Sequence, residues 1–342
     1  MNTVSDGSQG GFSRRRFLAN ASALSAASFL GLPRMVSAEG PPETTKIRLV
    51  SFPAICLAPQ YVAEEFLRAE GFTDISYTPW QGGNLAGHLA DGHADMTMDP
   101  AHELVYAMDT RPSLVAVAGI HSGCYELFGH DRVRAIRDLK EKKVAIYAYG
   151  GADHVLIASM LAYVGMDPRK DVDWIIPEAD SSTVRLFVER KVDAMMGFPP
   201  YPQELRAQKV GHVIVNTAQD PPWSHYFCCM LVVRREFTVR YPNATKRALR
   251  AYLKAADLCS NEPTQVADLL VKRGYEPRHA IALEVLSSLP YNRWHEGNPE
   301  DSLRFHALRL HEVGMIKSNP QKIIAQGTDW RFLNDLRKEL KA

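Results

Sequence analysis

Apolar and polar positions change their period within one short stretch of the chain. Alternation over residues 75–80 predicts a strand, and the amphipathic run 85–91 predicts a helix. Between them, the turn 81–84 supplies two glycines and an asparagine suited to capping that helix. Residues 95–98 predict a second strand that delivers Asp99 to a loop. Since ligands of open α/β sheets bind at the carboxyl ends of strands, both turns are candidate ligand contacts.

This pattern returns 98 positions later in the chain. Residues 172–177, 181–190 and 192–197 predict a strand, a helix and a strand in the same order. The matching positions pair Pro79, Asn84, Leu89, Asp95, Met98 and Asp99 with Pro177, Ser182, Phe187, Asp193, Met196 and Gly197. Residues 47–52 and 144–149 are also alike, as short apolar strands that run into a turn. The ordered repeat predicts two similar α/β lobes.

The rest of the pattern connects these lobes. The apolar run 114–120 predicts a strand of a parallel sheet, and 125–129 a first crossing between the lobes. Residues 226–233 predict a return strand. Beyond Pro242 the pattern is helical, with helices over 244–260, 264–273, 277–286, 300–313 and 330–340. We therefore expect one lobe from residues 46–125 with 230–342, and the other from residues 126–229.

The amino terminus has the pattern of an export signal. Three arginines at 14–16 precede Phe17 and an apolar, alanine-rich run over residues 19–32. Val36–Ala38 then offers small residues at a cleavage site. These features predict a twin-arginine signal peptide over residues 1–38, cleaved after Ala38, and therefore a periplasmic protein that uses the twin-arginine export machinery.

Composition excludes several classes of function. The net charge of +1 places +3 on residues 1–38 and −2 on the remainder, so no basic face for nucleic acid is expected. Cysteine spacing matches neither a disulfide framework nor a zinc site, and the adjacent pair in an apolar run should face opposite sides of a strand. Buried thiols are the favoured interpretation, with one disulfide left open outside the cytoplasm. The cysteines are Cys56, Cys124, Cys228, Cys229 and Cys259.

Several short motifs, in this order and spacing, give the chain a family resemblance. They are Ala58–Ala63, Gln81–Gly83, Gly92–Asp95, Asp138–Ala145, Lys191–Ala194 and Val313–Ile316. The chain resembles periplasmic substrate-binding proteins of ABC importers in the nitrate/sulfonate/taurine group, which includes NMT1-like proteins. The resemblance implies a type II "Venus flytrap" fold with two crossing strands, which closes on a small ligand. It also implies delivery to an ABC permease with a cytoplasmic ATPase, a monomer, no cofactor and no catalysis.

Candidate ligand contacts follow from the expected strand ends. The resemblance implies that the loops at 81–82, 99–100 and 150–151 face the ligand, and helix amino termini after such loops offer N–H groups. For each residue, capping or core packing is the competing interpretation. The candidates are Phe52, Pro53, Trp80, Gln81, Asn84, Asp99, His102 and His121 in the first lobe, and Tyr149, Gly151, Asp153, His154, Ser181, Phe198 and Tyr201 in the second.

Asp153 departs from the pattern of oxyanion binders, which place small hydroxyl residues at this turn. A carboxylate about 5 Å from an anionic ligand would cost roughly 3 kcal/mol at an effective dielectric near 20. Either Asp153 caps its helix and points away, or the ligand is neutral, zwitterionic or cationic. The supply of aromatic residues at the strand ends favours an aromatic or heterocyclic ligand over nitrate or a simple sulfonate.

Three rival functions remain open. The superfamily includes binders of thiamine pyrimidine precursors and a pyrimidine synthase with a cysteine-rich iron motif, but residues 225–230 carry fewer, shifted cysteines. A metal-binding protein is disfavoured because the histidine pairs 88/93 and 306/311 are five apart, a spacing that does not share one helical face. A sensor that reports ligand occupancy to a membrane receptor would use the same lobe closure.

Overall fold

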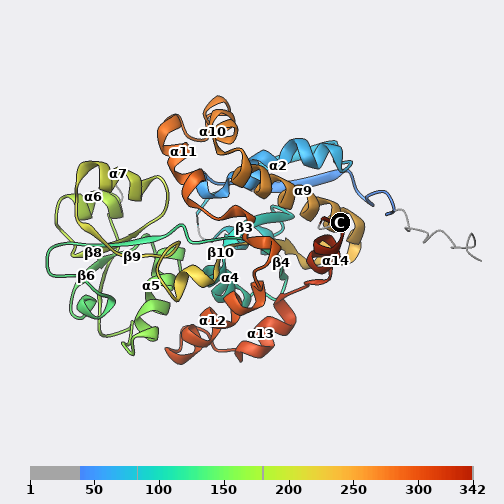
Figure 1. Cartoon of the computed structure of the whole chain (residues 1–342). Helices are drawn as coiled ribbons and strands as arrows, with labels where there is room; N and C mark the ends of the chain where they lie inside the picture. Colours follow the sequence, from blue (N-terminus) through green and yellow to red (C-terminus); the bar gives the residue numbers. More distant parts are fainter. Residues whose placement is uncertain (1–38, 83, 179–180, 341–342) are drawn as a thin grey trace, which may run out of the picture. The chain divides into compact units, whose positions relative to one another are not determined.

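The computed structural model describes residues 39–82, 84–178 and 181–340. The expected export signal at 1–38 lies outside the described residues. The described residues from position 41 onwards form one compact unit. Figure 1 shows two separate sheets with helices around them. Over the described part of the chain, no helix is both long and apolar enough to cross a membrane.

The first sheet has the strand order β2-β1-β3-β10-β4. Strands β1 and β2 run parallel, whereas β10 pairs antiparallel with both β3 and β4. Figure 1 shows β10, a late strand, beside β3 and β4. β3 and β4 are buried along their whole length, as expected for strands covered on both faces. The strands are β1 (Lys46–Ser51), β2 (Asp74–Pro79), β3 (Met96–Pro100), β4 (Leu114–Ser122) and β10 (Phe227–Arg234).

The second sheet repeats this arrangement in the order β7-β6-β8-β5-β9. β6 pairs parallel with β7 and β8, and β5 pairs antiparallel with β8 and β9. Each sheet therefore places one antiparallel strand in its fourth position. The strands are β5 (Glu126–Gly129), β6 (Lys143–Ala145), β7 (Asp173–Ile175), β8 (Ala194–Gly197) and β9 (His212–Asn216).

Helices follow the strands and then fill the carboxyl-terminal part. Helix α9 packs on α2, and α12 packs on α4 and α5. The helices of the repeat and its neighbours are α2 (Ala58–Ala69), α3 (Leu85–Ala90), α4 (Ala101–Met108), α5 (Ala152–Tyr163), α6 (Thr183–Val188) and α7 (Tyr201–Gln208). The later ones are α8 (Arg235–Arg240), α9 (Pro242–Asn261), α10 (Pro263–Lys272), α11 (His279–Ser288), α12 (Pro299–Glu312), α13 (Pro320–Gly327) and α14 (Arg331–Leu340).

The predicted repeat is confirmed at the level of single hydrogen bonds. Asn84 Oδ1 accepts from Gly87 N at the start of α3, and Ser182 Oγ accepts from Arg185 N at the start of α6. These are the caps that the residue types favour. One expectation fails here: Asp99 belongs to β3 and not to a loop, because the strand continues to Pro100.

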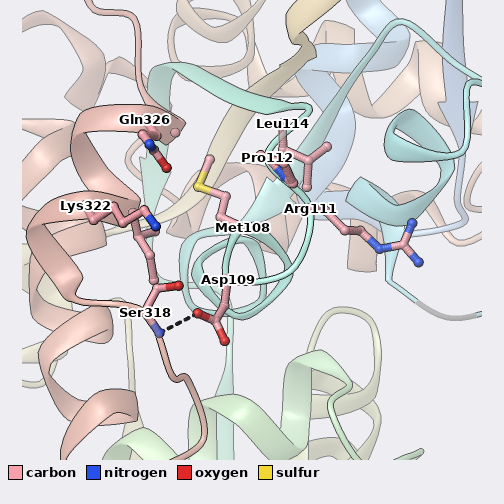
Figure 2. A pocket seen from close by; sticks show the side chains of 10 residues that line it. Met108, Asp109, Arg111, Pro112, Leu114, Ser318, Lys322 and Gln326 are labelled. Atoms are coloured by element: carbon pink, nitrogen blue, oxygen red, sulfur yellow. Dashed lines mark hydrogen bonds between the residues drawn. The ribbon is translucent and has the colours of Figure 1, made fainter.

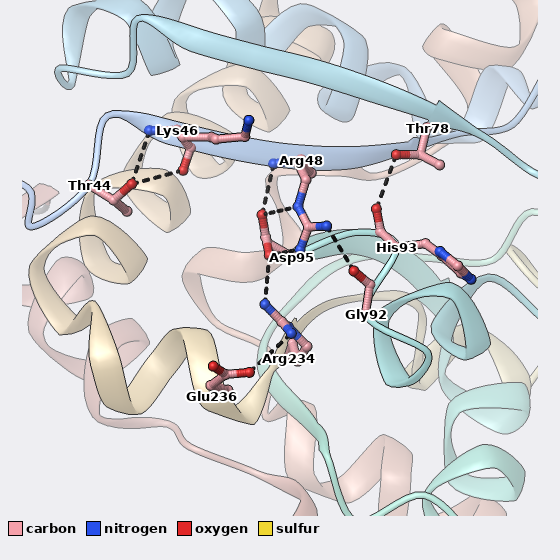
Figure 3. Close-up of polar contacts among 9 residues, drawn as sticks. All are labelled: Thr44, Lys46, Arg48, Thr78, Gly92, His93, Asp95, Arg234 and Glu236. Atoms are coloured by element: carbon pink, nitrogen blue, oxygen red, sulfur yellow. Dashed lines mark hydrogen bonds and ion pairs between the residues drawn. The ribbon is translucent and has the colours of Figure 1, made fainter.

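Asp95 fixes the amino ends of the strands in the first sheet (Figure 3). Its carboxylate accepts from Arg48 N at 3.0 Å and from both Nε and Nη2 of the same arginine. Arg234, at the end of β10, adds a bond of 3.2 Å from its Nη2. In the second sheet, Asp193 accepts from Lys143 N at 2.9 Å in the equivalent place. These contacts lie at the opposite strand ends from the candidate ligand turns.

Helix α13 does not appear in the sequence prediction, and side-chain caps explain its presence. Asn319 accepts from Gln321 N, and Asp109 at the end of α4 accepts from Ser318 N over 2.8 Å. Figure 2 shows Asp109 reaching this backbone beside a hollow of about 180 Å³ between α4 and α13. The hollow shares no lining residue with the larger cavity described below.

Candidate ligand-binding site

A cavity of about 640 Å³ opens among the loops at the carboxyl ends of strands from both sheets. This volume is within the range of small-molecule sites. Its lining is mainly apolar and aromatic, with a few polar groups. Predicted candidates that line it are Phe52, Pro53, Trp80, Asn84, Tyr149, Gly151, Asp153, Phe198 and Tyr201. The cavity therefore brings together candidates from both predicted lobes.

An aromatic wall runs across the cavity. The Phe52 ring lies 5.1 Å from the Trp80 ring and 5.9 Å from the Phe198 ring, measured between centroids. Phe198 also lies 5.5 Å from Tyr201 and 6.4 Å from Tyr147. Such separations are typical of edge and tilted aromatic contacts. Trp80 and Tyr147 are each 40% exposed, so part of each ring remains available to a ligand.

Tyr61, a buried residue of α2, orients Phe52. The Tyr61 hydroxyl accepts from Phe52 N at 3.0 Å and donates to Phe52 O. Gln60, the next residue along, donates to Val50 O and accepts from Met98 N, which ties α2 to β1 and β3. Sequence reasoning passed over both, because an amphipathic helix does not reveal which of its polar atoms reach a neighbouring strand.

The turn before α5 forms part of the cavity and depends on glycine. Gly150 has a φ of +79°, and a Cβ at this position would lie 2.9 Å from Tyr106 Cε1 of α4. Gly150 N donates to Nδ1 of His154 over 3.0 Å. Burial lowers the pKa of His154 to about 4, so its neutral ring can accept this bond. His154 does not line the cavity but holds the turn that does.

Asp153 borders the cavity and is 3% exposed. Gly151 is the capping residue of α5, so Asp153 is not the helix cap. Its carboxylate accepts from Tyr147 N at 2.6 Å and from His154 N at 2.8 Å. Burial raises the pKa of Asp153 to about 6, against the effect of these N–H groups. Asp153 thus fixes the loop after β6 while its carboxylate stays at the cavity wall.

Glu103 is the second acid at the cavity, and sequence reasoning missed it. It lies in the first turn of α4 and is 5% exposed. Burial, and next the charge of Asp153, raise the pKa of Glu103 to about 8. Asp99 is completely buried in β3 and does not line the cavity. Burial, followed by the charge of Glu103, raises the pKa of Asp99 well above its usual range.

The charged side chains of the cavity lining are all acidic. Among the described residues that line the cavity, Glu103 and Asp153 are the residues with carboxyl side chains, and none is lysine, arginine or histidine. At neutral pH a pKa near 6 leaves Asp153 mainly ionised, whereas a pKa near 8 leaves Glu103 mainly protonated. The site therefore offers one carboxylate and one carboxylic acid in an aromatic surrounding.

The other predicted contacts lie elsewhere. His102 is buried and lies 5.4 Å from the rings of both Tyr125 and His306. His121 is buried against Tyr291 at 5.0 Å. Gln81 and Ser181 are half-buried or exposed and do not line the cavity.

Several lining residues were not predicted as contacts because they come from elements whose role appears only in three dimensions. Tyr106 comes from the far turn of α4, and Tyr125 precedes the crossing strand β5. Tyr147 lies in the loop after β6. Pro100 and Gly150 line the cavity from two of the loops expected to face the ligand. The unpredicted lining residues are Ala54, Cys56, Leu57, Leu85, Glu103, Tyr106, Cys124, Tyr125, Tyr147, Ala148, Ala152 and Cys229.

The family model described as "NMT1-like family" matches residues 40–272, more than half of the chain. The chain belongs to this family. A curated relative, the nitrate/nitrite binding protein NrtA of Synechocystis sp., is 25% identical to this NMT1-like protein over 273 residues. The match covers 70% of this chain and 59% of the relative, so the chain spans about three fifths of that protein's length.

Solved structures share the two-sheet fold of this NMT1-like protein. The periplasmic nitrate-binding protein NrtA of Synechocystis superposes with a TM-score of 0.73 and 16% identity, over 88% of this chain and 90% of that one. The alkanesulfonate-binding protein SsuA of Xanthomonas axonopodis, bound to MOPS, superposes with a TM-score of 0.68 and 14% identity, over 84% of this chain and 99% of that one. The desulfurization enzyme DSZB superposes with a TM-score of 0.55 and 14% identity, over 87% of this chain and 99% of that one. The predicted periplasmic-binding-protein fold is confirmed, and this fold also occurs in an enzyme.

Proposed function

We propose that this NMT1-like protein is the periplasmic solute-binding component of an ABC importer. It captures a small organic ligand in the 640 Å³ cavity and passes it to a membrane permease. The observation that carries this proposal is the cavity itself, which joins loops from two sheets of the same topology. A cleft of this kind changes shape when the two sheets move relative to each other, which is how ligand occupancy is communicated to a partner.

The chemistry of the lining supports a planar, aromatic or heterocyclic ligand that carries a positive charge or hydrogen-bond donors. The Phe52, Trp80 and Phe198 rings provide faces and edges for a flat ring. Asp153 and Glu103 provide the acceptors for a cation or an N–H group. Trp80 and Tyr147, both partly exposed, are suited to contact a ligand cation through their ring faces.

Nitrate and simple sulfonates fit this lining poorly. An anion about 5 Å from the ionised Asp153 would be opposed by roughly 3 kcal/mol at an effective dielectric near 20, which lowers affinity about a hundredfold. The described lining offers no basic side chain to offset this cost. The ligands in the names of the relatives therefore do not transfer directly to this chain.

An enzyme and a sensor are the alternative functions. The likeness to DSZB keeps the enzyme open, because the same fold there supports catalysis. A thiamine-pyrimidine precursor would suit the aromatic lining as a ligand, whether it is transported or made. We favour binding because the curated relative is a binding protein. Twin-arginine export and a monomeric state belong to the same proposal.

A thermal-shift screen tests the proposal. A ligand at 100 times its dissociation constant stabilises the folded state by about 2.7 kcal/mol, which appears as a higher melting temperature. We expect pyrimidines, aromatic amines or amidines to raise the melting temperature, and Trp80→Ala to remove the effect while the free protein stays folded. Leu308→Ala is the control, since Leu308 is an exposed apolar residue outside the cavity. Shifts with inorganic oxyanions alone would overturn the assigned ligand class. Product release from a bound compound would favour the enzyme.

A further inference from the structure

Four cysteines from three separate segments meet beneath the cavity. Cys56 lies in the 3₁₀ turn Ile55–Leu57, Cys124 precedes β5, and Cys228 and Cys229 lie in β10. All four are buried. The Sγ atoms of Cys56, Cys124 and Cys229 lie within 4.8 Å of one another, and Cys124 Sγ lies 3.1 Å from Cys228 Sγ. The spacing in sequence could not reveal this cluster, because its members are brought together by the fold.

Cys228 and Cys229, which are adjacent in β10, line different hollows, yet both lie close to Cys124. The pairing of β10 with β4 is irregular on both sides of Cys229, with register shifts after Phe227 and after Cys229. Such irregularities re-aim side chains. As a result, Cys228 contacts Cys124, and Cys229 lies in the same cluster as Cys124 and Cys56.

The backbone of this cluster is held in an unusual conformation. Cys124 has a φ of +131°, a value that non-glycine residues rarely adopt. The preceding residue, Gly123, has no room for a side chain, because a Cβ there would lie 2.3 Å from Ala218 Cα. Non-glycine residues with such backbone angles concentrate at functional sites, where the surrounding structure has to hold them.

The separations suit a single metal ion. A tetrahedral zinc with Zn–S bonds of about 2.3 Å holds its sulfur ligands roughly 3.8 Å apart. The three Sγ atoms all lie within 4.8 Å of one another, which exceeds that spacing by about 1 Å at most. Thiols are weak hydrogen-bond partners, so packing four of them together gains little from hydrogen bonding. Thiolates, in contrast, are preferred ligands of soft cations.

We propose that Cys56, Cys124 and Cys229 bind one thiophilic d¹⁰ cation, Zn²⁺ or Cu⁺, at the floor of the cavity. All three residues line the cavity, which leaves one side of the ion facing it. Cys228 instead lines a small hollow on the other side, together with His102 and His306. The proposal concerns metal binding alone and does not depend on which ligand the cavity takes.

His121 supports this assignment from the neighbouring strand. It pairs with Cys229 across the β4–β10 ladder and is completely buried. Its Nε2 has no hydrogen-bond partner among the described residues. A ring N–H beside a metal-bound thiolate commonly stabilises such a site by hydrogen bonding to the sulfur. The metal site therefore gives the buried His121 ring a hydrogen-bonding role, which the ligand cavity does not.

The wild-type protein provides the first test and needs no substitution. Protein isolated without chelator and analysed by mass spectrometry and elemental analysis is expected to contain no disulfide and about one zinc or copper per chain. Reduced apoprotein should take up one equivalent of Zn²⁺ or, under anaerobic conditions, of Cu⁺, and the tighter ion identifies the occupant. Substitution with Co²⁺ should give sulfur-to-cobalt charge-transfer absorption. A reduced protein that binds neither ion would overturn the proposal, as would a Cys124–Cys228 disulfide that is present in the isolated protein and whose reduction restores no metal uptake.

Single substitutions then locate the site. Cys56→Ala and Cys229→Ala should each weaken metal binding at least a hundredfold, whereas Cys228→Ala should retain one ion per chain. Cys259→Ala is the matched control, because Cys259 is a completely buried thiol of α9 outside the cluster. Equal loss of metal in the Cys259 variant would contradict the assignment. Far-UV circular dichroism of each variant distinguishes the loss of a metal ligand from the loss of the fold. If a variant is unfolded, the Co²⁺ absorption of the wild-type protein decides the question.

Discussion

The carboxylate of Asp153 accepts a hydrogen bond from the backbone N–H of Tyr147 over 2.6 Å while bordering the ligand cavity. This contact combines elements of the two roles considered for Asp153. The side chain holds local structure, as a cap would, but it holds the loop after β6 and not the helix start, which belongs to Gly151. Since the loop places Tyr147 and Tyr149 at the cavity, Asp153 shapes the wall and gives it a charge at once.

Asp153→Asn separates these two roles. The amide oxygen can replace only one of the two carboxylate oxygens, which accept from Tyr147 N and His154 N, so we expect the free energy of unfolding to fall by about 1–3 kcal/mol. The affinity for a cationic ligand should fall about ten- to a hundredfold, because the charge is lost. In the wild-type protein that affinity should rise from pH 5 to pH 7, as Asp153 ionises with a pKa of about 6.

Titration calorimetry at pH 5, 6 and 7 measures this effect. The Asn variant should show a flatter profile than the wild-type protein. A variant that keeps the full affinity and the full pH dependence would show that Asp153 has only a structural role. Asp131→Asn is the control, since Asp131 is an exposed acid on the second sheet's connection and lies outside the cavity.

Glu103→Gln tests the buried acid through stability in the absence of ligand. Burial raises the pKa of Glu103 to about 8, above its value near 4.3 in the unfolded chain. The folded state therefore binds more protons between these values, and the contribution of Glu103 to stability is fully present below about pH 4 and lost as the pH rises toward 8. The Gln variant does not titrate at this position, so its free energy of unfolding does not contain this pH-dependent decrease.

Between pH 4.5 and pH 8.5 we expect the free energy of unfolding of the wild-type protein to fall by on the order of 4 kcal/mol relative to that of the Gln variant, because each pKa unit corresponds to about 1.4 kcal/mol. Urea unfolding at several pH values provides the comparison. A constant difference between the two proteins across this range would mean that Glu103 titrates normally. Glu65→Gln is a suitable control, because Glu65 is exposed on α2.

Gly150→Ala tests the turn before α5. Alanine at a φ of +79° costs roughly 1–2 kcal/mol of backbone strain, and its Cβ would meet Tyr106. Gly165→Ala is the matched control, since Gly165 has the same φ of +79° but open space around its Cβ. Both variants should lose similar stability from strain, while the Gly150 variant alone should lose at least tenfold in ligand affinity. Unchanged affinity in the Gly150 variant would remove this turn from the binding site.

Local patterns in the sequence were sufficient for the repeat. Asp95 N donates to Arg48 O, and Asp193 N donates to Lys143 O, at 2.8 Å in both cases. Each repeated unit is determined by short-range chemistry, such as a capping Asn or Ser and a glycine turn. The residue types at these positions therefore reveal the repeat. The strand order and the two antiparallel strands follow from the repeated units together with the family resemblance.

The cavity could be predicted only in part. Phe52, Trp80 and Asp153 stand at strand ends, where position along the chain already indicates a ligand contact. Glu103 and the cysteines were missed because their proximity depends on α4 and β10 packing beside distant segments. A strand that runs two residues further than its pattern, as β3 does, was enough to bury Asp99. Register shifts such as those in β10 leave no mark in local apolar periodicity.

The measurement that tests the ligand assignment most directly compares two probes of one shape and opposite charge. Benzamidine and benzoate share a planar ring, and titration calorimetry of each at pH 7.5 isolates the effect of Asp153 and Glu103. The assignment predicts that benzamidine binds at least about a hundredfold more tightly than benzoate, because a charge about 5 Å from Asp153 contributes roughly 3 kcal/mol of either sign. Tighter binding of benzoate, or of nitrate, would contradict it.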